Sequence, residues 1–207
     1  MTVMGWLSDN YIEVFGALTG IIYVFLEIRQ NIWLWPVGII TSAVYIWVFF
    51  TSKFYADMSL QGYYLVISII GWYWWRGAGS GGQGDVSSPH PKHDLLSVTH
   101  ISRKTVITLS VVFVFLYAIM WIILSRFTDS PVKAWDSFIT SLSVIATWML
   151  ARKIYEHWYL WIVVNLVSVI VFLIKGLHPT VVLYAVYCAM SFAGLIEWRK
   201  TIKRNIT

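Results

Sequence analysis

Charged residues are scarce in this chain of 207 residues, since only 12% are Asp, Glu, Lys or Arg while 58% are apolar. A soluble domain of this size needs more polar surface than that, so the composition excludes one. The mean hydropathy of +0.69 indicates that most of the chain lies in lipid. Cysteine is also rare: the single Cys188 allows no disulfide within the chain, and we interpret it as apolar packing.

The short motifs of several enzyme classes are missing as well. The chain has no GxSxG, no HExxH, no GxxxxGK[ST] and no acidic cluster in its apolar runs. It therefore lacks the motifs that hydrolysis, metal chemistry and ATP-driven pumping require. One polar group with metal-ligand side chains falls in a stretch rich in Gly, Ser and Pro, without helical spacing: His90, His93, Asp94 and His100. We interpret that stretch as a solvated loop, and we expect no metal and no cofactor.

Seven predominantly apolar runs are present, each near the length of about 20 residues that an α-helix needs to cross a bilayer. They cover residues 11–28, 33–51, 55–75, 105–125, 135–151, 158–174 and 180–198. The first ten residues carry Asp9 and no positive charge, so the first run is not predicted to be a cleaved signal sequence. The sequence therefore predicts an all-α integral membrane protein of seven transmembrane helices.

The distribution of Lys and Arg predicts the orientation. Four of the 15 lie on the side of the N-terminus and eleven on the other side, and basic residues concentrate in cytoplasmic loops. We therefore expect the N-terminus outside and the C-terminus in the cytoplasm. The net charge of +5 is explained by this bias, so no nucleic-acid partner is expected, and the partners are the lipid bilayer and a small molecule.

The two halves of the chain resemble each other. Four residues at the end of the third run match four at the end of the seventh at a constant offset of 123 positions: Ser68, Gly71, Trp75 and Arg76 against Ser191, Gly194, Trp198 and Arg199. A weaker match at an offset of 126 pairs the second run with the sixth, through Leu34, Trp35, Ser42 and Val44 against Leu160, Trp161, Ser168 and Ile170. The difference implies a deletion of three residues in the last loop.

A second group of three helices would be inverted unless one extra crossing restored its direction, which the fourth run supplies. The prediction is a 3+1+3 arrangement of parallel repeats, the layout of SWEET-type transporters, with substrate bound between the repeats. The predicted segments are a first repeat at 11–75, a cytoplasmic Gly/Ser/Pro-rich loop at 76–104, a linker helix at 105–125, a second repeat at 135–198, and a basic cytoplasmic tail at 199–207.

Two helical stripes carry the candidate substrate-binding residues. In the sixth run Trp158, Trp161 and Asn165 share one face with Ser168 and Phe172, and in the third run Gln61, Tyr64 and Ser68 share a face with Trp72. Indole faces beside an amide suit a flat heteroaromatic ligand or a delocalised cation. Two plainer interpretations stay open, because tryptophans gather at membrane interfaces and Asn can simply join helices.

Weaker signals come from two other runs. Asp136, Thr140, Ser143 and Thr147 form a stripe in the fifth run, but Ser and Thr often bond back to their own helix. Glu13 and Glu27 lie near opposite ends of the first run, where a carboxylate can reach the interface or cap a helix. Neither glutamate is assigned to the site.

Several segments resemble the Pnu family of bacterial vitamin transporters, over nearly all seven runs. They are VYIWVFFTSKFYADMSLQGYYL from Val44, IIGWYWWR at the end of the third run, and WDSFITSLSVIATWMLARKIYEHWYLWIVVN from Trp135 with the SVIVF that follows. The WxxWxxxN pattern of Trp158, Trp161 and Asn165 is similar to the motif associated with nicotinamide riboside binding in that family.

The resemblance implies a SWEET-like fold, a homotrimer, and facilitated diffusion of a vitamin, most nearly nicotinamide riboside, that a cytoplasmic kinase then traps. Related branches carry thiamine or riboflavin, so these remain alternatives. Thr41 and Ser68 stand where some nicotinamide riboside carriers have amide residues, which bears on the substrate rather than on the family. A membrane enzyme and a receptor are remote alternatives, because neither explains the three-helix repeat.

Overall fold

The structure is a computed structural model that describes residues 11–53, 55–79, 96–128 and 131–204. It is all-helical over these residues apart from turns and one isolated bridge. The helices are α2 (Tyr11–Ile28), α3 (Leu34–Thr51), α4 (Tyr55–Gly79), α5 (Arg103–Phe127), α6 (Lys133–Ala151), α7 (His157–Ile174) and α8 (His178–Arg204). The prediction of seven helices is confirmed, and α4 and α8 run beyond the predicted apolar segments, to Gly79 and Arg204.

Five helices are long and apolar enough to cross a membrane among the residues searched, namely α3, α5, α6, α7 and α8. The first helix contributes a shorter apolar stretch, Val14–Ile28. Helix α4 falls outside this group because its segment YADMSLQGYYLVISIIGWYWWRGAG is rich in polar and interfacial aromatic residues. Hydropathy therefore underrates a helix whose polar side chains face the interior of the bundle.

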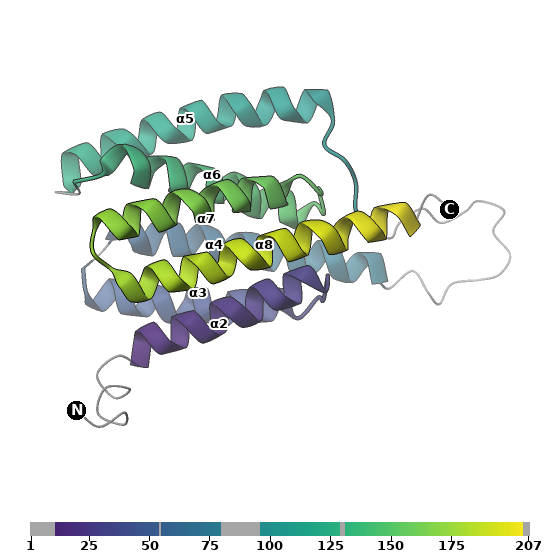
Figure 1. Ribbon diagram of the computed structural model, residues 1–207, viewed down its shortest axis with the longest axis horizontal. Coiled ribbons are helices and arrows are strands. Elements are labelled where there is room, and N and C mark those ends of the chain that lie inside the picture. The colour runs from purple at the N-terminus through teal and green to yellow at the C-terminus, as the bar shows by residue number, and fades with distance from the viewer. Residues whose placement is uncertain (1–10, 54, 80–95, 129–130, 205–207) are drawn as a thin grey trace, which may run out of the picture.

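Along the chain the helices divide into two sets of three, α2–α4 and α6–α8, with α5 between them, and we call these sets the two groups. Within the groups, α3 packs against α4 and α7 packs against α8, while α2 packs against α8 and α4 against α6 across the boundary. Helix α5 lies along one edge of the bundle beside α6, as Figure 1 shows. None of its side chains is buried, so its wide apolar surface is suited to lipid or to another membrane partner.

Matching turns end the corresponding helices of the two groups. After α2 and α6 the chain reverses through Gln30 (φ 52°) and Lys153 (φ 50°), and after α3 and α7 through Lys53 (φ 62°) and Gly176 (φ 72°). Both members of each pair are 123 positions apart. Left-handed residues of this kind close a helix by bonding its last carbonyl groups, as the Gln30 and Lys153 amides do with the carbonyls three residues earlier.

Four tryptophans, which we call the indole cluster, fill the end of the bundle where α2 and α6 terminate: Trp35, Trp75, Trp158 and Trp198. Trp35 and Trp75 pack edge to face at 5.4 Å, and Trp158 and Trp198 do the same at 5.9 Å. Each pair belongs to one group of helices. The cluster also joins the groups, because the Trp75 indole N–H donates to the Ala151 carbonyl at 3.1 Å and that of Trp198 to the Glu27 carbonyl at 3.0 Å.

Two glycines make room for this cluster. A Cβ on Gly71 would lie 2.7 Å from Cε2 of Trp35, and a Cβ on Gly194 would lie 2.6 Å from Cε2 of Trp158. The counterpart of Trp35 is therefore Trp158, at an offset of 123, and not Trp161. The pairing at an offset of 126 is wrong, and no deletion in the last loop is needed, because α3 and α7 begin and end at the same 123-residue spacing. A repeated Leu-Trp pair produced the false register.

The segment before α5 is tied to the turn between α6 and α7. Thr99 and Ile154 form a parallel bridge, and the Glu156 carboxylate accepts from the Ile101 amide at 2.9 Å while its other oxygen lies 2.8 Å from Nδ1 of His100. His100 is thus held by an ordinary side-chain contact. His90, His93 and Asp94 lie outside the described residues, as does most of the Gly/Ser/Pro-rich stretch.

Candidate functional site

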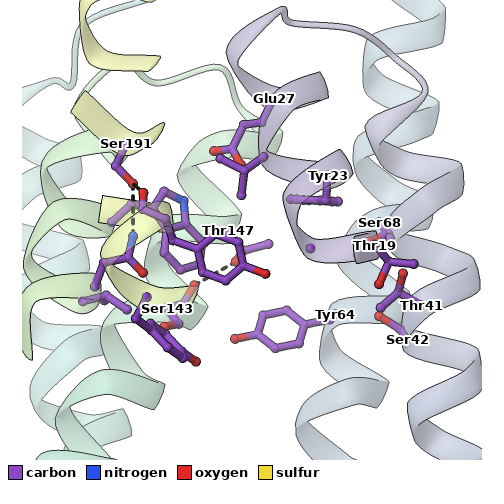
Figure 2. Close-up of a pocket in the computed structure, with 18 of the residues that line it drawn as sticks. Thr19, Tyr23, Glu27, Thr41, Ser42, Tyr64, Ser68, Ser143, Thr147 and Ser191 are labelled. Atoms are coloured by element: carbon purple, nitrogen blue, oxygen red, sulfur yellow. Dashed lines mark hydrogen bonds between the residues drawn. The ribbon is translucent and has the colours of Figure 1, made fainter. Parts of the chain in front are cut away.

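A cavity of about 300 Å³ lies between the two groups of helices. Its wall draws on all six of their helices, α2, α3 and α4 from one group and α6, α7 and α8 from the other, while α5 contributes nothing. Figure 2 shows hydroxyl groups of both groups facing this space, with Ser143 and Ser191 on one side and Tyr64 and Ser68 on the other. A concavity between helices that combines aromatic rings with converging polar groups is typical of a small-molecule site.

All six residues that the two stripes nominated line this one cavity. Trp158, Trp161 and Asn165 come from α7, and Gln61, Tyr64 and Ser68 come from α4. The two helices belong to different groups, so the stripes face a shared space from opposite sides. Three other members of the stripes do not line it: Trp72 is 38% exposed, Ser168 is fully buried, and Phe172 packs against Tyr184.

The α7 wall is aromatic and holds hydrogen-bond donors. Trp158 is held in place on Gly194 and against Trp198, and it is 1% exposed. Its indole N–H and that of Trp161 have no hydrogen-bond partner among the described residues. A buried donor without a partner is costly, so a hydrogen bond to either indole would offset that cost.

Asn165 is positioned by the neighbouring helix. One amide N–H donates to the Ser191 hydroxyl of α8 at 3.1 Å, and that hydroxyl donates in turn to the Tyr187 carbonyl at 2.8 Å. The amide is 5% exposed. This relay fixes the amide plane beside the indole wall, so its remaining hydrogen-bonding positions are oriented before a ligand arrives.

The fifth-run stripe divides between two places. Ser143 and Thr147 of α6 line the cavity, and the Thr147 hydroxyl donates back to the Ser143 carbonyl at 2.8 Å, as expected of a helical threonine. Asp136 lies near the start of α6, where Lys175 of α7 approaches it at 3.2 Å. This carboxylate and Thr140 are not part of the cavity wall.

Glu27 is the functional candidate that the sequence did not nominate. It lines the cavity and is 2% exposed, and its Oε1 lies 3.1 Å from Nε2 of His157. Figure 2 shows it at one end of the cavity, between Tyr23 and Ser191. A glutamate near a helix end gives no sequence signal of burial, and its partner is 130 residues away in the chain.

The two groups of helices share a backbone plan but differ in the side chains they bring to the cavity. At the 123-residue spacing, Trp161 corresponds to Gly38 and Asn165 corresponds to Ser42. All four line the cavity. The large indole and the amide therefore stand on α7 alone, and the place beside Gly38 of α3 is taken by Ser68 and Tyr23.

A bundle of seven helices, six of which, the two helix triplets α2–α4 and α6–α8, wall an aromatic and polar cavity, is typical of a membrane transporter for a small solute. The model of the nicotinamide mononucleotide transporter family matches residues 10–200, and the chain belongs to that family.

Relatives of known activity include transporters of two vitamins. The chain is 25% identical to the nicotinamide riboside transporter PnuC of Escherichia coli strain K12, over 94% of this chain and 87% of that protein. It is 24% identical to the riboflavin/roseoflavin transporter RibM of Streptomyces davaonensis, over 98% and 95%. The crystal structure of the vitamin B3 transporter PnuC has the same fold, with a TM-score of 0.71 at 22% identity over 98% of this chain and 86% of that one.

Proposed function

We propose that this protein carries nicotinamide riboside across the bacterial inner membrane by facilitated diffusion, without chemistry on the substrate. One observation carries the proposal: an indole wall and an oriented amide on α7 face polar side chains of α4 across a cavity between the two triplets. A pyridinium ring with an amide and a ribose matches such a wall, because the indoles can stack on the ring and the polar groups can bind its amide and sugar.

Each candidate residue then has a role. Trp158 and Trp161 stack the ring, and Asn165 together with Gln61 hydrogen-bonds the amide or the sugar. Tyr64 and Ser68 face the same space from α4 and supply hydroxyls. The size of the cavity, about 300 Å³, is at the lower end for small-molecule sites, which favours a single-ring nucleoside.

The proposed architecture is a 3+1+3 arrangement of parallel repeats, with α5 as the linker helix and the other segments divided as the sequence predicts. Support comes from the helix bounds, the left-handed turns and the Gly–Trp contacts, which recur at 123 residues. In this arrangement the two triplets rock about the cavity to give alternating access.

The proposed orientation places the N-terminus outside and the C-terminus in the cytoplasm. The indole cluster then lies at the cytoplasmic end, because α2 and α6 terminate there. A homotrimer, and trapping of the vitamin by a cytoplasmic kinase, complete the proposal and rest on the family resemblance. A cysteine at Lys200, which is exposed on α8, should react with an impermeant maleimide in inside-out vesicles and not in intact cells.

Riboflavin is a second candidate substrate, favoured by the relative RibM, which matches almost the whole chain. Thiamine is a third, since its thiazolium ring is also a flat cation. Riboflavin needs room for three fused rings, so it would require the cavity to widen more than nicotinamide riboside does.

The test is uptake of labelled nicotinamide riboside, thiamine and riboflavin, in separate assays, into liposomes that hold the purified protein and no ion gradient. Saturable entry of nicotinamide riboside alone is the expected result, with empty liposomes as the control. Entry of thiamine or riboflavin alone would overturn the substrate. Absence of all three would refute uncoupled vitamin transport.

A further inference from the structure

The cavity contains one carboxylate among its 21 lining residues, and that carboxylate is Glu27. It is held by His157, which is 0% exposed and packed between Trp158 and Trp198 at ring distances of 4.7 and 4.6 Å. A buried carboxylate needs a partner to offset its lost hydration. Only one of its oxygens is bonded to His157, so the other remains available beside the cavity.

The hydrogen bonds of His157 determine how many protons the pair holds. Its Nδ1 lies 2.7 Å from the Ile154 carbonyl oxygen, which can only accept, so Nδ1 carries a proton. Nε2 then bonds Glu27 in one of two ways: a neutral imidazole accepts from a protonated Glu27, or an imidazolium donates to an ionised one. Both forms contain one shared proton, and both have zero net charge.

Apart from Glu27, the cavity wall contains no carboxylate and no histidine in the part of the chain that the structure describes. On α2, α4 and α8 the cavity wall contributes Tyr23, Tyr64, Tyr184 and Tyr187, and tyrosines are neutral at pH 7. On α3, Tyr45 lies at the opposite end of α2, where it bonds the Ile12 carbonyl. Outside the cavity, Arg29 lies over the Phe25 ring, Lys153 over the Trp75 ring, and Glu197 binds Lys200 at the surface.

We propose that Glu27 selects substrate charge: a cationic heteroaromatic ring in the cavity displaces the proton shared by Glu27 and His157, leaving a carboxylate opposite the cation. This proposal rests on the proposed function and adds the property of the substrate, its positive charge, that the site selects. Binding places one positive charge in the site and releases one proton to solvent, so the charge of the occupied site stays balanced. Transport remains uncoupled as long as the empty carrier changes sides with or without that proton.

Two consequences follow by linkage. Affinity for a cation should rise with pH, by up to about tenfold per unit while the pair titrates, because fewer protons compete. Affinity for a neutral ligand of the same shape should not rise. A cavity without this carboxylate would show no such difference.

The experiment is isothermal titration calorimetry of the detergent-purified full chain at pH 6, 7 and 8. Each titration is done in two buffers of different ionisation enthalpy, because the difference in measured heat gives the number of protons released on binding. The cationic probes are nicotinamide riboside and thiamine. The neutral probes are riboflavin and a C-nucleoside analogue of nicotinamide riboside, in which a carbon–carbon bond joins the ribose to an uncharged ring. The variants are Glu27→Gln and, as a matched loss of one carboxylate at the same end of the bundle, Glu197→Gln.

For the natural chain and Glu197→Gln we expect proton release with a cation and none with a neutral probe. Glu27→Gln should lose the proton release and about tenfold in affinity for the cation, and should bind the neutral analogue within twofold of the natural chain. If Glu27→Gln does not fold, Glu27→Asp tests the same point, with proton release kept and the cation preference reduced.

If Glu27→Gln loses affinity equally for the cation and for the neutral analogue, Glu27 has a structural role and the proposal is overturned. The proposal would also be overturned if cation binding released no proton at all three pH values. Failure of the substrate assignment has a different signature: binding of thiamine alone, with proton release, would leave charge selection standing and refute nicotinamide riboside. Binding of riboflavin alone would refute both.

Discussion

The substitution Gly194→Ala should damage substrate binding from a position that does not line the cavity. The new Cβ would lie 2.6 Å from Cε2 of Trp158, whereas carbon atoms in contact are normally about 3.5–4.0 Å apart, so the indole must retreat by about 1 Å. Trp198 and His157 already pack against this ring, which leaves the cavity as the direction of movement. Overpacking of this kind costs about 1–3 kcal/mol.

The repeat supplies a matched control in Gly71→Ala. Its Cβ would lie 2.7 Å from Cε2 of Trp35, so it creates nearly the same clash, with the same gain in helix propensity, in the other triplet. Trp35 is fully buried and does not line the cavity. Thermal unfolding should show similar losses of stability for both variants, while nicotinamide riboside binding should fall about tenfold or more only in Gly194→Ala, where about 1.4 kcal/mol of ring contact is lost.

Either of two results would refute this reasoning. If both variants bind the ligand as the natural chain does, Trp158 is part of the fold and not of the site. If both lose binding equally, the loss comes from general destabilisation of the bundle rather than from a displaced stacking surface. Calorimetry on detergent-purified protein, at a temperature well below both unfolding midpoints, separates these outcomes.

Three further predictions concern other contacts. Asn165→Ala should weaken nicotinamide riboside binding roughly tenfold or more in calorimetry, since buried hydrogen bonds are worth about 1–3 kcal/mol when a partner is left unpaired, whereas Ser168→Ala on the same helix should bind normally. Trp75→Phe and Trp198→Phe should each lower the free energy of unfolding by about 1–3 kcal/mol, measured in denaturant, because each leaves a helix-end carbonyl without its donor. Glu156→Ala should speed amide hydrogen exchange at Ile101, which that carboxylate accepts from, and unchanged exchange would show that the bridge to Ile154 alone holds the segment.

The helices were predictable because long apolar runs have few alternatives in lipid. The predicted end of the first run at Ile28 is also the end of α2. Hydropathy could not find the ends of α4 and α8, since a helix continues past the bilayer wherever its sequence allows. The repeat at the ends of the third and seventh helices was also readable. Its register in the second and sixth was not, because Trp158 and Trp161 compete as the counterpart of Trp35, and the Leu before Trp161 favours the wrong one; the glycine contacts and the helix bounds distinguish them.

The six nominated residues were found through helical periodicity, which places them on one face of α4 or α7. That both faces meet at one cavity could not be derived from periodicity, because it depends on which helices pack together. Glu27 was missed for a related reason. A carboxylate near a helix end is usually solvated, and only the fold brings His157, 130 residues away, within 3.1 Å of it.

The departure of the two triplets from symmetry explains why one ligand suits a scaffold made of two similar units. A strictly symmetric cavity would offer the same wall twice, and a nucleoside with a ring at one end and a sugar at the other cannot match both. Here α7 carries Trp161 where α3 has Gly38, so this indole occurs once in the cavity wall. The glutamate has no counterpart either, since the residue 123 positions after Glu27 is Leu150. Of the residues repeated at this spacing, Trp158 alone of the indole cluster lines the cavity, whereas Trp161, Asn165 and Glu27 line it without an identical counterpart. In the proposed mechanism these unrepeated side chains therefore determine which ligand is recognised.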